Sequence, residues 1–379
     1  MKVLLVTDEM EIGGSQRQIT ELALGLRKAG DEVCVAWFRS PSFLLDRLVD
    51  DGVRVVHVPK RARVDIGFVR ALHGLIAREA FDVVHAYAFT AELWTCVALS
   101  FVSPRARPAF VTSIRGTYEW YGRLQWRLKT WATDRSDAVI ANAGPAADFA
   151  FDRMARPRDR LAIVRNGIAV PAPSEARRAH ARAALGLGPD DVAAMFVGRL
   201  VEHKNLPMLL RAVERVAREG ARVRLVVVGD GPQRPELEAM AAQRGISARI
   251  RFLGSRDDAV DLLVGADMLV LSSWREGLPN AVIEAMQSGC AVVATRVGGV
   301  PEILDDSVDG LIVEPDDDAA LASAILRLER DASLRDRLRS RALARSRREH
   351  SVDAMVASTR EVYARIVPGP VATPRPSSP

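Results

Sequence analysis

Short apolar, β-branched runs alternate along nearly the whole chain with longer amphipathic stretches. Strands that alternate with helices in this way form βαβ units, which build parallel sheets covered by helices on both faces. Two similar sets of runs predict an α/β chain with two doubly wound parallel sheets. We expect strands at residues 2–7, 32–38, 53–58, 82–87, 109–114 and 138–143, and then at 192–198, 223–229, 249–254, 268–273, 290–295 and 310–314.

The length of 379 residues also favours two domains, because a single hydrophobic core rarely extends beyond about 250–300 residues. The alternation is interrupted by "RNGIAVPAPSEARR" at 165–178, where an Asn-Gly turn signal and two prolines mark a linker. We therefore predict a Rossmann-like first domain over 1–168 and a second over 169–350. A helix pattern covers 351–367, and the Pro-rich segment 368–379 is predicted to be disordered.

The composition is typical of a globular protein, with 48% apolar and 27% charged residues. No apolar stretch approaches the about 18 residues of a membrane span. Acids follow the first apolar run at once and no small-residue cleavage site appears, so we expect a first strand rather than a signal peptide and a cytoplasmic protein. Cys34, Cys96 and Cys290 lie far apart without CxxC spacing, which is typical of reduced, buried thiols.

The formal net charge is +5, and the basic residues are spread among acids. A nucleic-acid partner would need a clustered basic stripe, so we expect none. The segment 123–131, "RLQWRLKTW", interleaves Arg, Lys and Trp at helical spacing. It fits either a peripheral contact with an anionic membrane surface, at the inner face of the plasma membrane, or a half-exposed helix. Lysine is rare, and the five lysines are Lys2, Lys28, Lys60, Lys129 and Lys204.

Ligands of open α/β sheets bind outside the carboxyl ends of the strands. Two such domains joined by a short linker are expected to place these edges face to face across a cleft. After the first strand, Gly13, Gly14 and Ser15 precede a helix whose first amides suit an anion, although a Gly-Gly pair also serves as a simple turn. After the strand at 192–198 come Arg199 and Lys204. The choice of Lys204 in an Arg-rich chain indicates a compact point charge for a diphosphate, with a solvated basic loop as the alternative.

The stretch "WREGLPNAVIEAM" at 274–286 places two acids around a helix start. Pro279 suits a first helical position, and the free amides nearby form the positive end of the helix dipole. An acid ahead of a helix is an ordinary electrostatic preference. Beside a diphosphate, however, Glu276 and Glu284 would be repelled, so neutral hydroxyls are their expected partners. A diphosphate between two polyhydroxylated ends describes a nucleotide sugar.

Other strand-end loops give weaker signals. The loop at 252–255, which includes Leu253, offers backbone groups to a nucleobase, but it also fits a simple turn. Gly298 and Gly299 fit a backbone nest for an anion, with Pro301 at a first helical position, or a tight turn. The acidic runs at 257–258 and 316–318 are expected to be solvated loops, and we predict no metal site.

The order of these motifs resembles the family 4 retaining glycosyltransferases, which have the GT-B fold of two Rossmann-like, doubly wound parallel-sheet domains facing across a cleft. The resemblance covers nearly the whole chain. Its most specific part is the E-x7-E pattern, Glu276 to Glu284. The matching motifs are "GGSQRQI", "RNGI", "VGRLVEHKN", "VVGDGP", "RFLG" and "REGLPNAVIEAMQSGCAVVATRVGGVPEIL".

The resemblance implies that the second domain holds a nucleotide-sugar donor, with a UDP-sugar favoured, and that no metal or other cofactor is needed. The first domain would bind a glycan or polyprenyl-linked acceptor, and the helix over 351–367 would cross back to it. Glu276, Arg199 and Lys204 would be the catalytic residues. The donor-binding set would be Gly14, Arg199, Lys204, Leu253, Glu276, Gly277, Leu278, Pro279, Asn280 and Glu284, with Glu284 on the ribose.

The acceptor side departs from the family pattern. Many relatives carry a histidine after the fifth strand, where this chain has Arg115, which favours an anionic acceptor feature. Ser15, His85, Arg115 and Tyr118 are the predicted acceptor-side residues, although His85 fits a hydrogen-bonded core histidine equally well. Two alternatives stay open: a UDP-sugar epimerase of GT-B fold, such as a UDP-GlcNAc 2-epimerase, and a non-catalytic sugar-nucleotide-binding subunit.

Overall fold

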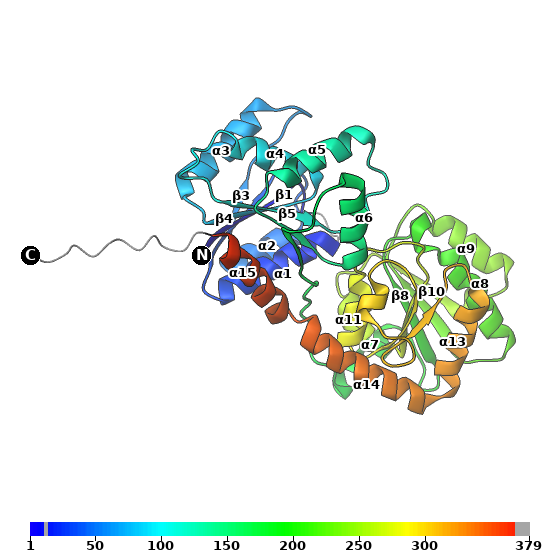
Figure 1. Cartoon of the computed structure of the whole chain (residues 1–379). Helices are drawn as coiled ribbons and strands as arrows, with labels where there is room; N and C mark the ends of the chain where they lie inside the picture. Colours follow the sequence, from blue (N-terminus) through cyan, green and yellow to red (C-terminus); the bar gives the residue numbers. More distant parts are fainter. Residues whose placement is uncertain (11–13, 368–379) are drawn as a thin grey trace, which may run out of the picture. The chain divides into compact units, whose positions relative to one another are not determined.

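The computed structural model describes residues 1–10 and 14–367, and these form two compact units with one parallel sheet each (Figure 1). Unit 1 comprises Met1–Gly167 and the final helix, and unit 2 comprises Ile168–Ser351. The predicted turn residue Gly13 and the tail 368–379 lie outside the described residues.

The strands of unit 1 are β1 (Lys2–Thr7), β2 (Glu32–Trp37), β3 (Arg54–His57), β4 (Val83–Tyr87), β5 (Ala109–Ile114), β6 (Ala138–Ala141) and β7 (Leu161–Ile163). Those of unit 2 are β8 (Val192–Val197), β9 (Val223–Val228), β10 (Ile250–Gly254), β11 (Met268–Leu271), β12 (Ala291–Thr295) and β13 (Leu311–Val313).

Helices follow most strands, as the alternating pattern predicts. Unit 1 contains α1 (Gly14–Lys28), α2 (Phe43–Asp50), α3 (Ile66–Glu79), α4 (Phe89–Leu99), α5 (Arg123–Asp134), α6 (Gly144–Met154) and α15 (Val352–Ile366). Unit 2 contains α7 (Glu175–Ala184), α8 (Leu206–Arg218), α9 (Arg234–Gln243), α10 (Ala259–Leu263), α11 (Asn280–Gln287), α12 (Val300–Ile303), α13 (Asp318–Arg330) and α14 (Ala332–Glu349).

The predicted fold class is confirmed, because each expected strand is present with ends that differ by at most two residues. The strand that the pattern missed is β7, which has three residues and half-exposed side chains at the edge of its sheet. Such a strand carries no apolar run long enough to stand out from the sequence.

Both sheets reverse their strand order at one point. The order is β3-β2-β1-β4-β5-β6-β7 in unit 1 and β10-β9-β8-β11-β12-β13 in unit 2, and neighbouring strands are parallel. The order reverses between β1 and β4 in unit 1, and between β8 and β11 in unit 2. Loops that leave these paired strands diverge to opposite faces of the sheet, which opens the crevice where α/β proteins bind ligands.

Alternate residues of a strand supply the cores on the two faces of the unit 1 sheet. Val3 and Leu5 of β1 join the core beneath α1 and α15, whereas Leu4 and Val6 join the core beneath α3 and α4. This follows from the two-residue period of a strand. In Figure 1, α15 lies beside α1, and Met355 belongs to the same core as β1.

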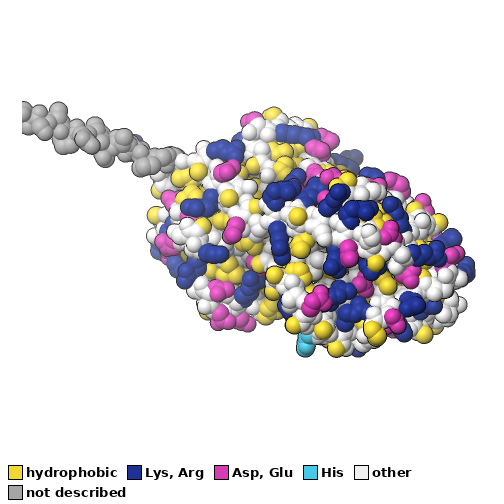
Figure 2. Space-filling model, turned by 90° about the horizontal axis from the view of Figure 1, so that it is seen from below, with side chains coloured by type: hydrophobic (Ala, Val, Ile, Leu, Met, Phe, Trp, Pro, Cys, Tyr) yellow, Lys and Arg dark blue, Asp and Glu magenta, His cyan; other side chains and the backbone are white. Residues whose placement is uncertain are grey.

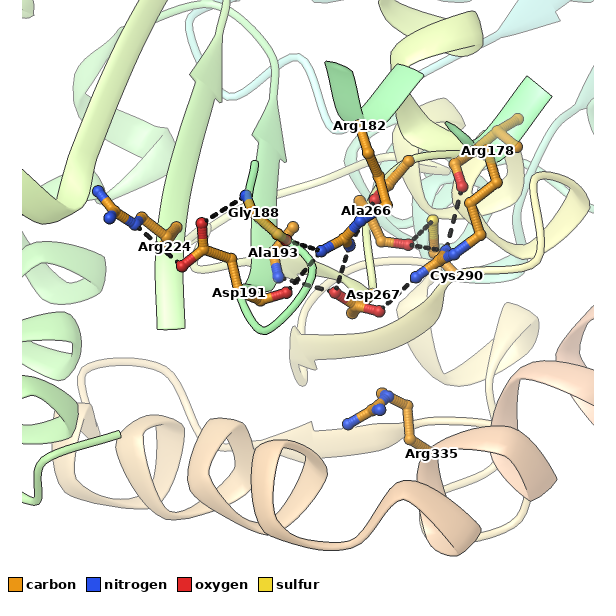
Figure 3. Close-up of polar contacts among 12 residues, drawn as sticks. Arg178, Arg182, Gly188, Asp191, Ala193, Arg224, Ala266, Asp267, Cys290 and Arg335 are labelled. Atoms are coloured by element: carbon orange, nitrogen blue, oxygen red, sulfur yellow. Dashed lines mark hydrogen bonds and ion pairs between the residues drawn. The ribbon is translucent and has the colours of Figure 1, made fainter. Parts of the chain in front are cut away.

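An ion-pair network fixes α7 against the amino-terminal edge of the unit 2 sheet (Figure 3). Asp267, just before β11, accepts hydrogen bonds from Arg178 at 2.6 Å, from Arg182 at 3.2 Å and from the backbone N–H of Ala193 at 2.8 Å. Cys290 donates its thiol hydrogen to a backbone oxygen nearby, and burial raises the pKa of this thiol to about 12. This edge is therefore occupied by structural contacts, opposite to the edge where ligands are expected.

The surface charges are mixed on the face drawn in Figure 2, where Lys and Arg side chains stand among Asp and Glu side chains without an unbroken basic stripe. Among the described residues, no helix is both long and apolar enough to cross a membrane. The three cysteines are buried and unpaired, as predicted.

Close packing of α1 on α15 gives the first testable prediction. A Cβ atom added at Gly25 would overlap Val356 Cγ2 and lie 2.9 Å from Val352 Cγ1. We expect Gly25→Ala to lower the free energy of unfolding by about 1–3 kcal/mol, although Ala normally favours a helix. Adding Val356→Ala should restore part of this loss, which denaturant unfolding of the single and double variants measures. Gly74→Ala on α3 is the control, because its Cβ would meet only the flexible end of Arg78. Equal losses at Gly25 and Gly74 would contradict the packing argument.

Candidate functional site

Two loops meet at the point in unit 2 where the strand order reverses. Lys204 lies after β8 and Glu276 lies after β11, and Lys204 Nζ is 2.6 Å from Glu276 Oε1. Their side chains are 17% and 9% exposed, so the pair is largely enclosed but still accessible. The sequence prediction placed one residue on a diphosphate and the other on a sugar. The ion pair means that groups bound to these two residues would be immediate neighbours.

Serine hydroxyls hold both members of the ion pair in place. Ser273 donates its hydroxyl hydrogen to Glu276 Oε1 at 2.6 Å, and Ser272 donates to the backbone oxygen of Lys204 at 2.9 Å. Thr295, at the end of β12, donates to the backbone oxygen of Ser273 at 2.7 Å. The carboxyl ends of β8, β11 and β12 are thereby joined. Sequence reasoning treated the two serines as the end of a strand and missed this role.

Gly298 and Gly299 support the same loop from the β12 side. Gly298 has a φ of +49°, and a Cβ atom there would overlap the backbone oxygen of Glu276. Gly299 donates its N–H to the backbone oxygen of Gly277 at 2.7 Å. The expectation of an anion-binding nest is therefore wrong for Gly299, whose amide is used within the protein. Pro301 is the second residue of α12 rather than the first.

Helix α11 begins one residue later than predicted. Pro279 has φ −74° and ψ 105°, which is extended backbone, so it caps the helix and Asn280 is the first helical residue. Proline fixes φ but leaves ψ free, and the sequence alone cannot place a helix end within one residue. Glu276 still precedes the helix and Glu284 lies inside it, 5% exposed. Gly277, Leu278 and Pro279 form the short loop between the carboxylate and the helix start.

Positive charge is concentrated around this loop. Burial lowers the pKa of His203, the Lys204 charge lowers it further, and the charges of Arg199 and Arg275 act in the same direction. Glu276 opposes this effect. The backbone oxygen of His203 accepts the N–H of Trp274 at 2.8 Å, which ties the two loops together. His203 and Arg275 were not singled out in the sequence because a single His or Arg in an Arg-rich chain carries little signal.

Acids near the site have structural partners. Asp316 accepts the side-chain N–H groups of Asn205 at 2.9 Å and Trp274 at 2.7 Å, so this exposed acid fastens both loops. The expectation of a merely solvated loop is wrong for Asp316.

Leu253 lies half-buried at the carboxyl end of β10, and Gly254 beside it accepts the N–H of Gly229 at 2.8 Å. Leu253 is therefore at the same sheet edge as Lys204, two strands away from β8.

The carboxyl edge of the unit 1 sheet contains the predicted acceptor residues. Gly14 and Ser15 form the first turn of α1, with Gly14 exposed and Ser15 half-buried. Asp8 directly follows β1, and burial raises its pKa while the charge of Arg39 lowers it. Asp8, a carboxyl group beside the point where the strand order reverses, was not among the predicted site residues.

His85 lies in the core of unit 1, which corrects its acceptor-side prediction. It is fully buried, Nδ1 is 2.7 Å from the hydroxyl of Tyr363 and Nε2 is 2.8 Å from the hydroxyl of Ser113. Burial, and then the charge of Arg115, hold the pKa of His85 well below its usual range. The alternative interpretation, a core histidine with both nitrogens paired, describes its surroundings.

Arg115 and Tyr118 do share one loop after β5. The Tyr118 hydroxyl accepts the backbone N–H of Arg115 at 2.8 Å, and the Arg115 guanidinium donates to Asn166 Oδ1 at 2.9 Å. The guanidinium also lies 5.0 Å from the ring centre of Tyr87. Among the residues that the structure describes, its buried Nε and the buried hydroxyl of Tyr87 have no hydrogen-bond partner. The Arg115 side chain is therefore held by contacts within unit 1.

Behind this loop lies a buried ion pair between Lys129 of α5 and Glu92 of α4, with side chains 2% and 1% exposed. Glu92 accepts the backbone N–H of Ser113 at 2.9 Å, and Lys129 donates to the backbone oxygen of Ser113 at 2.9 Å. Lys129 therefore belongs to the core. The prediction of a basic helix face at 123–131 is corrected for this residue.

The low pKa of His85 predicts a pH dependence of stability. A folded-state pKa below the unfolded value of about 6.5 means that the neutral form is favoured, so stability is lost as the pH falls below about 6.5. Wild type should lose up to about 1.4 kcal/mol per pH unit relative to His85→Gln in denaturant unfolding. The exposed His180, changed to Gln, is the control and should behave like wild type. An equally steep decline in His85→Gln would contradict the assignment.

Two family models match the chain. The model described as "Glycosyltransferase Family 4" covers residues 12–170, and that described as "Glycosyl transferases group 1" covers residues 192–331. The D-inositol 3-phosphate glycosyltransferase of Xylanimonas cellulosilytica is 30% identical over 94% of this chain and 92% of its own length. The lipopolysaccharide core biosynthesis glycosyltransferase LpsE of Rhizobium meliloti is 38% identical over 42% of this chain and 46% of its own length. The D-inositol 3-phosphate glycosyltransferase of Streptomyces bingchenggensis is 33% identical over 62% of this chain. The chain spans about half the length of these last two relatives, at 46% and 54%.

Solved structures share the fold. Anabaena HepE in complex with UDP and glucose superimposes with a TM-score of 0.86 at 21% identity, covering 96% of this chain and all of that one (100%). A glycosyltransferase from Rickettsia africae gives 0.83 at 17% identity, covering 96% of this chain and 98% of its own. Both superpositions extend over the two units. Sequence identities of 21% and 17% show a shared fold alone.

Proposed function

The chain belongs to the family 4, or group 1, glycosyltransferases and has their GT-B fold, and we propose that it transfers a hexose-type sugar from a nucleoside-diphosphate sugar to a glycan or lipid-linked acceptor. One observation carries this proposal. The Lys204–Glu276 ion pair, 2.6 Å long, lies at the carboxyl ends of β8 and β11, where the strand order of unit 2 reverses.

The geometry suits a ligand with a diphosphate next to a sugar. Lys204 supplies a compact charge for the diphosphate, and Arg199, exposed beside it, supplies a second. Glu276 accepts hydrogen bonds from sugar hydroxyls, with the backbone of 277–280 and the positive end of α11 beside it. Glu284 is assigned to the ribose, and Leu253 to the wall of the nucleobase site. Gly14 of unit 1 stays a predicted donor-binding residue.

The proposed reaction proceeds with retention of anomeric configuration. The bond between the anomeric carbon and the diphosphate oxygen breaks, and a bond from the same carbon to the acceptor oxygen forms on the same face. The proton of the acceptor hydroxyl passes to the departing diphosphate oxygen. Lys204, Arg199 and the start of α11 stabilise the charge that develops on the diphosphate, which is a preorganised electrostatic role. Glu276 binds and orients the sugar, and no metal takes part.

The donor is proposed to be a UDP-sugar, because structures of the related fold in HepE contain UDP and UDP-glucose. Two relatives are named for lipopolysaccharide core biosynthesis, which supports a role in cell-surface polysaccharide or glycolipid assembly. The acceptor is assigned to the carboxyl edge of the unit 1 sheet, where Ser15, Arg115 and Tyr118 lie. Arg115 there favours an acceptor with an anionic group, such as a polyprenyl-linked phosphate.

The Lys204–Glu276 assignment predicts the behaviour of conservative variants. Glu276→Gln and Lys204→Met should each lower kcat/KM for transfer by about 100-fold or more, because each removes a charge that acts on the transition state. Radiolabel transfer from a panel of UDP-, GDP- and ADP-hexoses measures this loss. Asp258→Asn is the matched control, since Asp258 and Arg256 form an exposed ion pair at 2.6 Å in the same unit. Wild-type turnover in Glu276→Gln or Lys204→Met would contradict the donor site.

The same assay separates the proposal from its alternatives. A transferase releases nucleoside diphosphate in proportion to added acceptor, whereas an epimerase converts the donor without one and a non-catalytic subunit only binds it. Proton NMR of the product should show the anomeric configuration of the donor. Activity should survive EDTA, and its loss on chelation with recovery on adding Mg²⁺ would contradict the metal-independent mechanism.

A further inference from the structure

A groove of about 750 Å³ lies on unit 1 between α5, α6 and the residues before α5. Its lining combines aromatic rings with guanidinium groups, chiefly Tyr121, Trp126, Arg123, Arg127, Arg153 and Arg156. We propose that this groove is a binding site for an anionic saccharide chain. All lining residues belong to unit 1, and none of them is among the residues assigned to the donor.

The charge of the groove is strongly positive. Its lining contains one carboxylate, Asp134, and this carboxylate is already paired with Arg156 at 2.7 and 2.9 Å. Within residues 1–10 and 14–367, no carboxylate forms an ion pair with Arg123, Arg127 or Arg153. Three guanidinium groups therefore face the groove without a compensating acid. Guanidinium groups bind carboxylates and phosphates through two parallel hydrogen bonds, which selects an anionic ligand.

The aromatic lining selects a ligand with flat, partly apolar faces. Tyr121 and Trp126 have ring centres 5.5 Å apart, and Trp126 lies 6.1 Å from Phe149. Phe149 is not part of the lining, but Arg153 is, and its guanidinium lies over the Phe149 ring at 5.2 Å from the ring centre. Pyranose rings expose C–H groups on one face and can pack on such rings, while their carboxylate or phosphate substituents reach the guanidinium groups.

The groove is continuous with the loop assigned to the acceptor. Tyr121 lines the groove and also stacks on Tyr118, with ring centres 4.9 Å apart and planes 12° apart. Tyr118 in turn accepts the backbone N–H of Arg115. A saccharide that begins at the sheet edge can therefore continue past Tyr121 toward Arg127 and Arg153. The link to an acceptor rests on the proposed function. Binding of a saccharide in the groove does not depend on that function.

The shape of the groove favours a saccharide over an anionic bilayer. Trp126 is 9% exposed, so this ring is recessed, and a flat lipid surface cannot enter as a single chain of sugar rings can. Two apolar side chains near it do protrude, Trp120 at 73% and Leu124 at 62% exposed. An anionic bilayer is therefore the competing occupant, and binding to vesicles is measured as well.

Binding is tested on the full chain without any donor. The probe is fluorescently labelled hexagalacturonate, a carboxylated saccharide, with maltohexaose as its neutral counterpart, at physiological ionic strength. We expect hexagalacturonate to bind wild type at least about tenfold more tightly than it binds Arg127→Gln/Arg153→Gln, because two charge-assisted contacts are lost. Arg78→Gln/Arg105→Gln removes two exposed arginines outside the groove lining and should bind like wild type.

Three results would overturn the proposal: undiminished binding by the groove variant, equal binding of maltohexaose, or failure of wild type to bind hexagalacturonate. Sedimentation with phosphatidylcholine–phosphatidylglycerol vesicles measures binding to an anionic bilayer. If wild type binds vesicles but not hexagalacturonate, and the groove variant loses vesicle binding, the groove is a membrane contact instead. Glu276→Gln should keep full hexagalacturonate binding, and the groove variant should bind a UDP-sugar with the affinity of wild type. Failure of this site and failure of the donor site are thereby distinguished.

Discussion

The loop from Ser272 to Asn280 can keep its shape only because the backbone of Gly298 passes directly against it. A side chain at Gly298 would occupy the position of the Glu276 backbone oxygen, and Gly299 donates a hydrogen bond to the next residue, Gly277. The Glu276 carboxylate is then fixed from two further sides by Lys204 and Ser273. A carboxylate held by three strand-end loops loses little freedom when it binds a ligand, which is the physical basis of preorganisation.

Unit 1 uses buried polar contacts to shape the corresponding edge. Tyr363 of α15, His85 of β4 and Ser113 of β5 form one hydrogen-bonded line, and the Lys129–Glu92 pair holds the backbone of Ser113 from the other side. Burying an ion pair is costly, and the hydrogen bonds of Glu92 and Lys129 to the backbone of Ser113 offset part of that cost. Arg115 follows two residues later. The path of the loop after β5 therefore depends on a core that links α4, α5 and α15.

The sequence predicted the fold well because strand periodicity and the spacing of βαβ units are local signals. It predicted Glu276 before a helix that contains Glu284 for a similar reason, since Glu276, Pro279 and Glu284 lie close together in the chain. It missed contacts that join distant segments. Nothing near His85 reveals Tyr363, and nothing near Lys129 reveals Glu92. Gly298 was noted as a turn, but its close approach to Glu276 depends on two strands that are adjacent only after folding.

The central claim, that the Lys204–Glu276 pair holds a diphosphate beside its sugar, is tested most directly by a crystal structure with an unhydrolysed UDP-hexose. The account predicts a diphosphate oxygen within hydrogen-bond distance of Lys204 Nζ and a sugar hydroxyl within hydrogen-bond distance of a Glu276 carboxylate oxygen. The account would be contradicted by a nucleotide sugar that binds elsewhere and contacts neither residue. In that case the 2.6 Å contact between Lys204 and Glu276 would be unchanged.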